Sequence, residues 1–292
     1  MIAGVDIGGT KLLALAVDEQ GAVHGEARVP TPDDPIDIIK AICELVGQVA
    51  PDASAVGIGI AGLIGRDGQI RVSPHIPFAA GYDLAGGVTS RLNIPVTIEN
   101  DANVAAWGEA RVGAGRGIDD LVLITLGTGI GSGVVCNGAL VRGHHGFGGE
   151  AGHMVVDRRG AVHVTGLPGA WEMYASGNAL GSLVRDAGLG DDGEAIAALL
   201  AAGDEKALAL LDRYAWEVAV GIVGLAAVLD PQLVVIGGGV SDLGEPLRAA
   251  VERHIPSMLI GASHRTELRI VLATLGERAG AIGAALLAVD SN

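Results

Sequence analysis

Two short segments of this sequence combine residue types that can bind phosphate. Residues 5–11 read V-D-I-G-G-T-K, and residues 126–133 read L-G-T-G-I-G-S-G. In each, an apolar run leads into a glycine–threonine turn. Glycine lets successive backbone N–H groups face one concavity, and the threonine hydroxyl adds a donor. One such turn is more often only a connection between strands, but two copies favour a pair of loops that hold a nucleotide phosphate.

The candidates for nucleotide binding follow from this repeated pattern. Lys11 also fits an exposed strand residue without a phosphate contact, so its role stays open. The loop candidates are Gly8, Gly9, Thr10, Lys11, Gly127, Thr128 and Gly129.

A polar strand end near residue 100 is a candidate for catalysis. Residues 97–103 read T-I-E-N-D-A-N, so an apolar strand ends in polar residues that open a helix. Asn100 or Asp101 suits the N-cap of that helix. The carboxyl ends of strands in an open α/β sheet also border the ligand crevice, where Asp101 would accept the proton of a substrate hydroxyl in line with a γ-phosphate. Capping and general-base catalysis both remain open at this position.

Two carboxylates and an imidazole further along the chain can bind a polyol. Glu150 and His153 lie in G-E-A-G-H, and Glu172 follows in G-A-W-E-M. Carboxylates accept hydrogen bonds from sugar hydroxyls, and histidine can donate at one ring nitrogen and accept at the other. Each residue by itself also fits an ordinary polar position. Gly62 is a further expected contact of the substrate.

The elements that must position these residues alternate between strands and helices, which is typical of a mixed α/β protein. Apolar runs predict strands at residues 2–7, 11–18, 21–29, 54–61, 95–99, 120–126, 130–136 and 233–236. Helical periodicity predicts helices at residues 36–49, 83–92, 102–112, 177–186, 206–229 and 278–289.

A glycine-rich connector at residues 113–117 marks the expected domain boundary, because it lacks an apolar pattern. We therefore expect a smaller N-terminal α/β domain at residues 1–116, with the first phosphate loop and Asp101. A larger C-terminal α/β domain at residues 117–292 would hold the second phosphate loop and the sugar-binding residues. The final helix is a candidate to pack back on the N-terminal domain.

Composition limits the classes of partner. Of 292 residues, 49% are hydrophobic, which is enough for a sizeable core. The net charge is −15, with 34 acidic and 19 basic residues, and no basic cluster is present, so nucleic acid is not an expected partner. An acidic surface does not prevent ATP binding, because local loop dipoles and a magnesium ion decide that contact.

Cysteine content and the chain start bear on location. Cys43 and Cys136 are widely separated in apolar contexts, so a reducing compartment is expected. Met1 leads directly into the first loop without targeting features, and the most apolar later segment, at residues 218–229, is too short to span a bilayer. We expect a cytoplasmic protein without a membrane partner.

The motifs in their order resemble the ROK family, which comprises bacterial sugar kinases and related repressors within the actin-like ATPase superfamily. The sequence is most similar to the glucokinases of that family. The resemblance runs essentially from end to end. It is carried by D-I-G-G-T-K at residues 6–11, E-N-D-A-N at 99–103, G-T-G-I-G at 127–131, E-A-G-H at 150–153 and G-G-G at 237–239.

The resemblance implies a two-domain actin-like ATPase (ribonuclease H-like) fold, with a duplicated β-sheet core and ATP in an interdomain cleft. It places the phosphates at the two glycine–threonine loops and the nucleoside near Gly238 and Gly239. Asp6 would organise Mg²⁺, through water. Asp101 matches the family's catalytic base. The matching sugar contacts are Asn100 and Glu150 for the hydroxyls, and His153 and Glu172 around the anomeric end.

One segment departs from the family pattern. Kinases of this family commonly bind structural zinc through the histidine of E-x-G-H and three cysteines in C-x-C-G-x-x-G-C. Here the cysteine positions hold His163, Thr165 and Ala170. Because tetrahedral structural zinc normally takes four nitrogen or sulfur ligands, no family-type zinc site is expected. The remaining candidate ligands are His144, His145, His153 and His163, and Trp171 and Pro168 are candidates to brace the loop of Glu172 instead.

The function implied by the resemblance is that of an ATP-dependent hexose kinase. The expected substrate is glucose, phosphorylated at its 6-hydroxyl, and the alternatives within the family are an N-acetylhexosamine kinase and a fructokinase. A catalytically silent sugar-binding sensor is the alternative of another class. The motifs do not decide between ATP and polyphosphate as the donor, although the G-G-G turn favours ATP. A homo-oligomer, a dimer or a tetramer, is expected from the family.

Overall fold

The chain divides into two compact units in the computed structural model, which describes residues 1–74, 76–190, 193–265 and 268–290. Unit 1 comprises Met1–Asp119, Gly133–Gly149 and Thr274–Asn292, and unit 2 comprises Asp120–Ser132 and Glu150–Ala273. We expected a single boundary between residues 116 and 117, but the chain returns to unit 1 twice.

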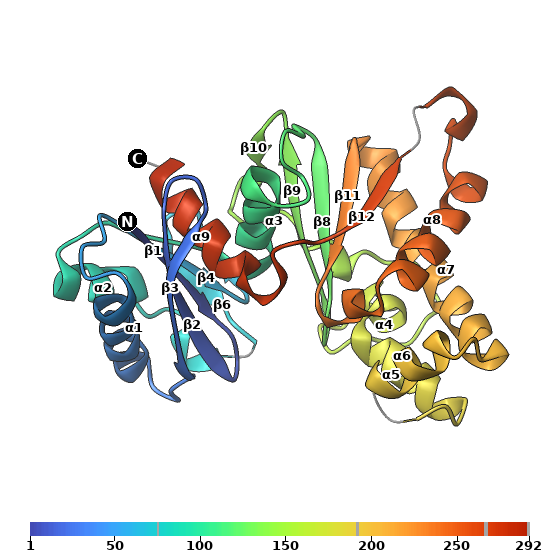
Figure 1. The fold of residues 1–292 in the computed structure, drawn as a ribbon, viewed down its shortest axis with the longest axis horizontal. Helices are drawn as coiled ribbons and strands as arrows, with labels where there is room; N and C mark the ends of the chain where they lie inside the picture. The colour runs from blue at the N-terminus through green and yellow to red at the C-terminus, as the bar shows by residue number, and fades with distance from the viewer. Residues whose placement is uncertain (75, 191–192, 266–267, 291–292) are drawn as a thin grey trace. The chain divides into compact units, whose positions relative to one another are not determined.

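A five-stranded sheet forms the centre of unit 1 (Figure 1), with the strand order β3-β2-β1-β4-β7. Strands β1 and β2 pair antiparallel, as do β2 and β3, whereas β1, β4 and β7 run parallel. The strands are β1 (Ile2–Ile7), β2 (Lys11–Val17), β3 (Val23–Pro30), β4 (Val56–Ile60) and β7 (Val96–Asn100). The carboxyl ends of the parallel strands therefore meet at one edge, where Asp101 begins the next helix.

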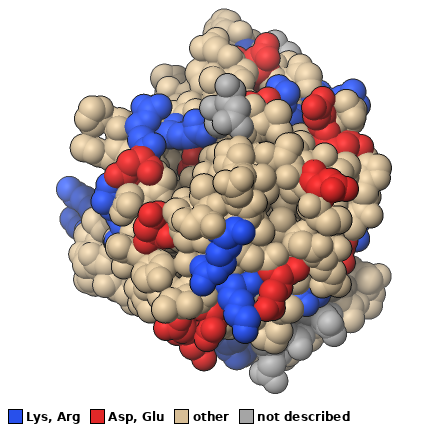
Figure 2. All heavy atoms as spheres, turned by 90° about the vertical axis from the view of Figure 1, so that its left-hand side faces the viewer, with Lys and Arg blue, Asp and Glu red and all other residues tan. Residues whose placement is uncertain are grey.

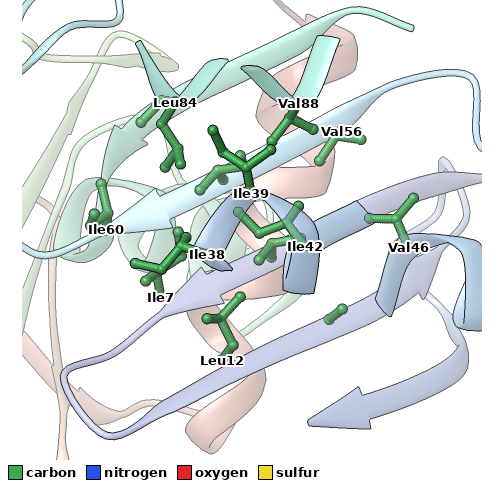
Figure 3. Packing of buried hydrophobic residues seen from close by; sticks show 14 of the residues in the cluster. Ile7, Leu12, Ile38, Ile39, Ile42, Val46, Val56, Ile60, Leu84 and Val88 are labelled. Carbon is green, nitrogen blue, oxygen red and sulfur yellow. The ribbon is translucent and has the colours of Figure 1, made fainter. Parts of the chain in front are cut away.

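Helices α1 (Pro35–Val49) and α2 (Leu84–Leu92) cover one face of this sheet. Apolar residues recur along α1 at the spacing of one helix face, which gives the helix an apolar stripe to bury. Figure 3 shows these side chains pointing toward those of β1, β2 and β4. The labelled members of this core are Ile7, Leu12, Ile38, Ile39, Ile42, Val46, Val56, Ile60, Leu84 and Val88.

The other face of the sheet packs against α9 (Ala279–Asp290) and α3 (Asp101–Val112) at very short range. An ideal Cβ on Gly4 would lie 1.9 Å from the carbonyl oxygen of Ala281, and one on Gly57 would lie 1.8 Å from that of Ala284. The sheet accepts α9 because glycines leave room for the helix backbone. The small residues of α9 bury almost its whole length, which explains why the final segment belongs to unit 1.

The second sheet repeats the plan of the first. Its strand order is β10-β9-β8-β11-β12, in which β8, β11 and β12 run parallel and lie in unit 2. In each sheet the first three strands are neighbours in chain order, and the last two strands lie on the other side of the first strand. The duplication expected from the two loops is therefore present. The strands are β8 (Leu121–Leu126), β9 (Ile130–Cys136), β10 (Ala139–Leu140), β11 (Leu233–Gly237) and β12 (Arg269–Leu272). The chain re-enters unit 1 along β9, so β10 belongs to that unit.

The helices of unit 2 surround one long helix, α7 (Glu205–Leu229). It begins at the N-cap Asp204, whose side chain accepts hydrogen bonds from Lys206 N and Ala207 N, and ends at Asp230 in the left-handed conformation. The others are α4 (Glu172–Ala175), α5 (Gly177–Asp186), α6 (Gly193–Ala201) and α8 (Glu245–Met258). Among the described residues no helix is both long and apolar enough to cross a membrane.

The strands and helices predicted from periodicity are present, with ends shifted by a few residues. Some further elements were not predicted. They are α4, α6, α8, β10, β12 and the hairpin of β5 (Leu63–Ile64) and β6 (Ile70–Val72). Basic and acidic side chains lie interspersed on the face shown in Figure 2.

Candidate active site

Strand alternation places Asp6 on the face of the first sheet that carries α3 and α9. Val5 and Ile7 point into the core under α1, so Asp6 between them points the other way. An ideal Cβ on Gly59, in the neighbouring strand β4, would lie 3.8 Å from Asp6 Oδ1 and 3.7 Å from Asp101 Cα. The structure thus brings together the predicted magnesium ligand and the predicted general base.

Helix α3 begins at Asp101 because Asn100 caps it. The Asn100 Oδ1 atom accepts a hydrogen bond of 3.0 Å from Asn103 N, and its Nδ2 donates 3.0 Å to the carbonyl oxygen of Gly62. The capping interpretation is therefore correct for Asn100. Asp101 occupies the first helical position, where the N-terminal partial charge of the helix favours a carboxylate.

The turn at Gly62 belongs to the same side-chain arrangement. Gly62 has φ of +139°, and an ideal Cβ there would lie 2.0 Å from the carbonyl oxygen of Val72. Only glycine fits this turn without strain. Two of the predicted sugar contacts, Gly62 and Asn100, are therefore hydrogen-bonded to each other.

A buried ion pair that sequence reasoning missed lies directly before Asn100. Arg142 Nε donates 2.5 Å to Glu99 Oε2, and Glu99 Oε1 accepts from Asn100 N at 2.9 Å and Asn103 Nδ2 at 3.1 Å. The Glu99 side chain is 6% exposed and that of Arg142 is 28% exposed. Removing one member of a buried pair leaves an uncompensated charge, so this pair helps to fix the strand end that carries Asp101.

The first predicted phosphate loop is a tight turn between β1 and β2. Gly8 N donates 3.0 Å to the carbonyl oxygen of Lys11, and Thr31 Oγ1 donates 2.6 Å to the carbonyl oxygen of Gly8. Gly9 and Thr10 are exposed at its tip. Lys11 Nζ lies 2.5 Å from Glu277 Oε2, so its ammonium group has an acidic partner on the surface of unit 1.

The environment of Asp6 alters its acidity. The pKa of the Asp6 carboxyl is raised to about 7, first by burial and then by the charge of Asp101, while the charge of Lys11 lowers it. Asp6 faces the first turn of α9, where an ideal Cβ on Gly280 would lie 3.0 Å from its Cγ. A carboxylate in this position suits a divalent cation, since Mg²⁺ takes oxygen ligands and keeps most of its waters.

The second predicted phosphate loop borders a pocket in unit 2. Gly127 N donates 3.0 Å to the carbonyl oxygen of Gly129, which closes the turn between β8 and β9. A pocket of about 660 Å³ lies beside Thr128 and extends along α5 and α6 to Gly239. Gly238 has φ of +79°, and an ideal Cβ there would lie 2.6 Å from Leu126 N. Three of the predicted nucleotide residues of unit 2, Gly127, Thr128 and Gly239, thus line one pocket.

The predicted sugar residues of unit 2 also lie near one another. His153 Nε2 is 3.8 Å from Glu150 Oε2, and the rings of His153 and His163 have centroids 5.3 Å apart. His163 Nε2 is 2.7 Å from Glu172 Oε1. From the sequence, His163 was only a remaining candidate for a zinc ligand. The signal available was its place at the first cysteine position of the family pattern, two residues before Thr165.

The donor atoms present do not match a family-type zinc site. Among the described residues, His153, His163 and Glu172 offer donor atoms within 4.8 Å of one another. Thr165 and Ala170 provide no thiolate for the two further positions of a four-coordinate structural site. The separation of 2.7 Å between His163 and Glu172 is that of a hydrogen bond. No chemical step is therefore assigned to zinc.

The sequence as a whole matches a known protein family. The ROK family model covers residues 2–291. The chain belongs to the ROK family. A glucokinase from Streptomyces coelicolor is 37% identical over 98% of this chain and 96% of its own length. An N-acetylmannosamine kinase from Escherichia fergusonii is 35% identical over 97% of each chain.

A solved structure supports the fold assignment. The ROK family glucokinase from Streptomyces griseus, in complex with glucose and AMPPNP, superposes with a TM-score of 0.87, at 37% identity and with 99% of each chain covered. The expected family and its actin-like ATPase fold are thereby confirmed.

Proposed function

We propose that this ROK protein is an ATP-dependent hexose kinase that transfers the γ-phosphoryl group of ATP to the 6-hydroxyl of glucose. The observation that carries the proposal is the pairing of Asp6 with Asp101 at the ends of parallel strands, beside the first phosphate loop. The glucokinase relatives, which match nearly the full length of the chain, favour glucose as the substrate.

In the proposed reaction Asp101 is the general base. Its carboxylate accepts the proton of the 6-hydroxyl as that oxygen forms its bond to the γ-phosphorus, while the bond from phosphorus to the β–γ bridging oxygen breaks and ADP leaves. Phosphoryl transfer depends mainly on positioning and charge stabilisation. The capped start of α3 and the bonds of Glu99 position the carboxylate.

Asp6 is the proposed magnesium-binding residue, through water. Bound Mg²⁺ would neutralise charge on the β- and γ-phosphates. Burial, and after it the charge of Asp101, raises the pKa of Asp6, and a divalent ion would favour the charged form of this carboxyl. In the loops at Gly8 to Lys11 and Gly127 to Gly129, the N–H groups other than those of Gly8 and Gly127, which close the two turns, would donate to the phosphates.

The pocket beside Gly239 is the proposed nucleoside site. Its lining from α5, α6 and the segment after β11 is mainly apolar, which suits a purine. In unit 2, Glu150, His153 and Glu172 would bind sugar hydroxyls. In unit 1, Asn100 and Gly62 would do so.

An N-acetylmannosamine kinase is the second candidate. Relatives with that activity are 35% identical over 97% of this chain, close to the value for the glucokinases. Both activities use the same phosphoryl-transfer chemistry and differ in the sugar. The substrate panel must therefore include N-acetylated sugars.

The test is ADP release with Mg-ATP across glucose, mannose, fructose, N-acetylglucosamine and N-acetylmannosamine. We expect the highest kcat/KM with glucose and a loss of roughly 10²- to 10⁴-fold in kcat for Asp101→Asn. The matched control is Asp52→Asn, which changes an exposed aspartate in a loop and should leave kcat unchanged. Sugar binding without ADP release from the wild type would refute the kinase and favour a silent sensor.

A further inference from the structure

Glu172 is held at both of its carboxylate oxygens by groups of unit 2. Its Oε2 accepts a hydrogen bond of 2.9 Å from Ile130 N, the first residue after the second phosphate loop. Its Oε1 is 2.7 Å from His163 Nε2. An ideal Cβ on Gly129 would lie 2.1 Å from Glu172 Oε2, so glycine at that position is also what lets the carboxylate reach the loop.

The surroundings of His163 define which ring nitrogen carries the proton. Thr165 N donates to His163 Nδ1 at 3.3 Å, and Thr165 Oγ1 lies 2.8 Å from the same nitrogen. Because Nδ1 accepts a hydrogen bond, the proton of the neutral ring is on Nε2, where it is donated to Glu172. Thr165 therefore sets the tautomer that Glu172 requires.

The segment around His163 is itself closed. His163 N donates 2.8 Å to the carbonyl oxygen of Leu167, and Gly166 N donates 2.8 Å to that of His163. The side chain of His163 is only 12% exposed. The imidazole is thus presented from a short hydrogen-bonded turn, which reduces the entropy lost when it fixes Glu172.

A separate anchor holds the other end of this segment. Trp171 is fully buried, and its Nε1 donates 2.9 Å to the carbonyl oxygen of Glu217 in α7. The ring lies over Gly221, where an ideal Cβ would approach it to 2.0 Å. Trp171 fixes the backbone before Glu172, whereas the direction of the carboxylate depends on Ile130 and His163.

We infer that His163 is a positioning residue, which orients Glu172 by a hydrogen bond from Nε2 and thereby holds the second phosphate loop without a metal ion. The linkage runs from Thr165 through His163 and Glu172 to Ile130 N. The inference rests on the proposed roles of Glu172 and this loop in sugar and phosphate binding. Thr165 and Ala170 stand where the family pattern has cysteines, so the hydrogen bond takes over the bracing of this segment.

The kinetic test compares His163→Ala with the conservative variant His163→Gln in the full-length protein. The Gln amide can donate to Glu172 from nearly the position of Nε2, whereas Ala cannot. We expect His163→Ala to lower kcat/KM roughly 10- to 100-fold through misplacement of the loop, and His163→Gln to recover most of that loss. His264→Ala, at an exposed histidine, is the matched control and should behave as the wild type.

Two readouts do not depend on turnover. Comparison of the ¹⁵N-histidine NMR spectra of the wild type and His163→Gln identifies the His163 signal as the one that the variant lacks. In the wild type this signal should have the shifts of a neutral ring protonated at Nε2. After incubation with zinc and dialysis, the wild type should hold far less than one zinc per chain, and its melting temperature should not change. Stoichiometric zinc, the other tautomer, or equal damage in His163→Gln and His163→Ala would overturn the inference. Failure of every sugar to react would refute the proposed function, while the tautomer and zinc content would still decide the role of His163.

Discussion

Glu109 is a fully buried carboxylate in α3, and replacing it gives a quantitative test of how unit 1 is held together. Its Oε1 accepts 2.8 Å hydrogen bonds from Thr274 N and Leu275 N, and its Oε2 accepts 2.7 Å from Ala114 N and 3.2 Å from Thr274 Oγ1. Ala114 and Thr274 lie near the points where the chain passes between units 1 and 2. One side chain therefore fixes two chain segments that are far apart in sequence.

The expected cost follows from the bonds that each substitution removes. Glu109→Ala leaves the three backbone N–H groups without their acceptor, and at about 1–1.5 kcal/mol for each net bond this amounts to about 3–5 kcal/mol. Glu109→Gln keeps one oxygen for Thr274 and Leu275 but turns a donor toward Ala114 N, which costs about 1–2 kcal/mol. At about 2–4 °C per kcal/mol, the melting temperature should fall by about 6–20 °C for Ala and about 2–8 °C for Gln.

The assay combines thermal melting with hydrogen exchange of peptides that cover residues 113–118 and 272–278. Exchange should accelerate in both segments of Glu109→Ala, because both lose the same acceptor. Glu252→Ala is the control, at a carboxylate of unit 2 that accepts a hydrogen bond from Arg248. Unchanged exchange in either segment, or melting of Glu109→Ala within about 2 °C of the wild type, would refute the reasoning.

Two further predictions concern the same unit. Folding raises the pKa of Asp6 from 3.8 to about 7, so between these pH values the folded state keeps a proton that the unfolded state has released. Without magnesium, the free energy of unfolding should therefore fall as the pH rises from 4 to 7. Asp6→Asn should remove this dependence, which urea titrations at pH 5 and pH 8 would measure. Gly283→Ala should lower the free energy of unfolding by about 1–3 kcal/mol or more, since its Cβ would lie 1.7 Å from the carbonyl oxygen of Val104. Gly47→Ala, whose Cβ would meet no atom within 4 Å, should stabilise α1 by about 0.5–1 kcal/mol. Equal melting temperatures for these two glycine variants would contradict the packing described for α9.

Much of the fold was predictable because its signals are local. The glycine–threonine turns lie between apolar runs, and strand alternation decides which way Asp6 points from β1. The matching strand orders of the two sheets follow from the duplication visible in the loops. The start of α3 was also visible, since Asn and Asp at the end of a strand mark an N-cap, and Asn100 is that cap.

The partners of the buried charges were not predictable in this way. Arg142 lies 43 residues after Glu99, and Thr274 lies 165 residues after Glu109. Periodicity reports which residues share a face of one element, but it carries no information about which distant segment supplies a donor. The proposed role of His163 was not predictable for the same reason. Glu172 lies in α4, and its hydrogen bond with His163 depends on the turn that the bond from His163 N to the carbonyl oxygen of Leu167 closes.

The location of the buried polar groups suggests how the structure keeps Asp101 in place. Glu99 and Asn103 are buried at the start of α3, and Glu109 is buried near its end, so both ends of the helix are tied by hydrogen bonds to other segments. Between them, close packing on α9 fixes the helix sideways, since Gly108 and Gly283 leave no room for a Cβ. Asp101, as the proposed general base, must be held to within about 0.5 Å to act well. In this chain that precision comes from contacts along the whole helix, so substitutions far from the substrate should lower kcat through the position of Asp101.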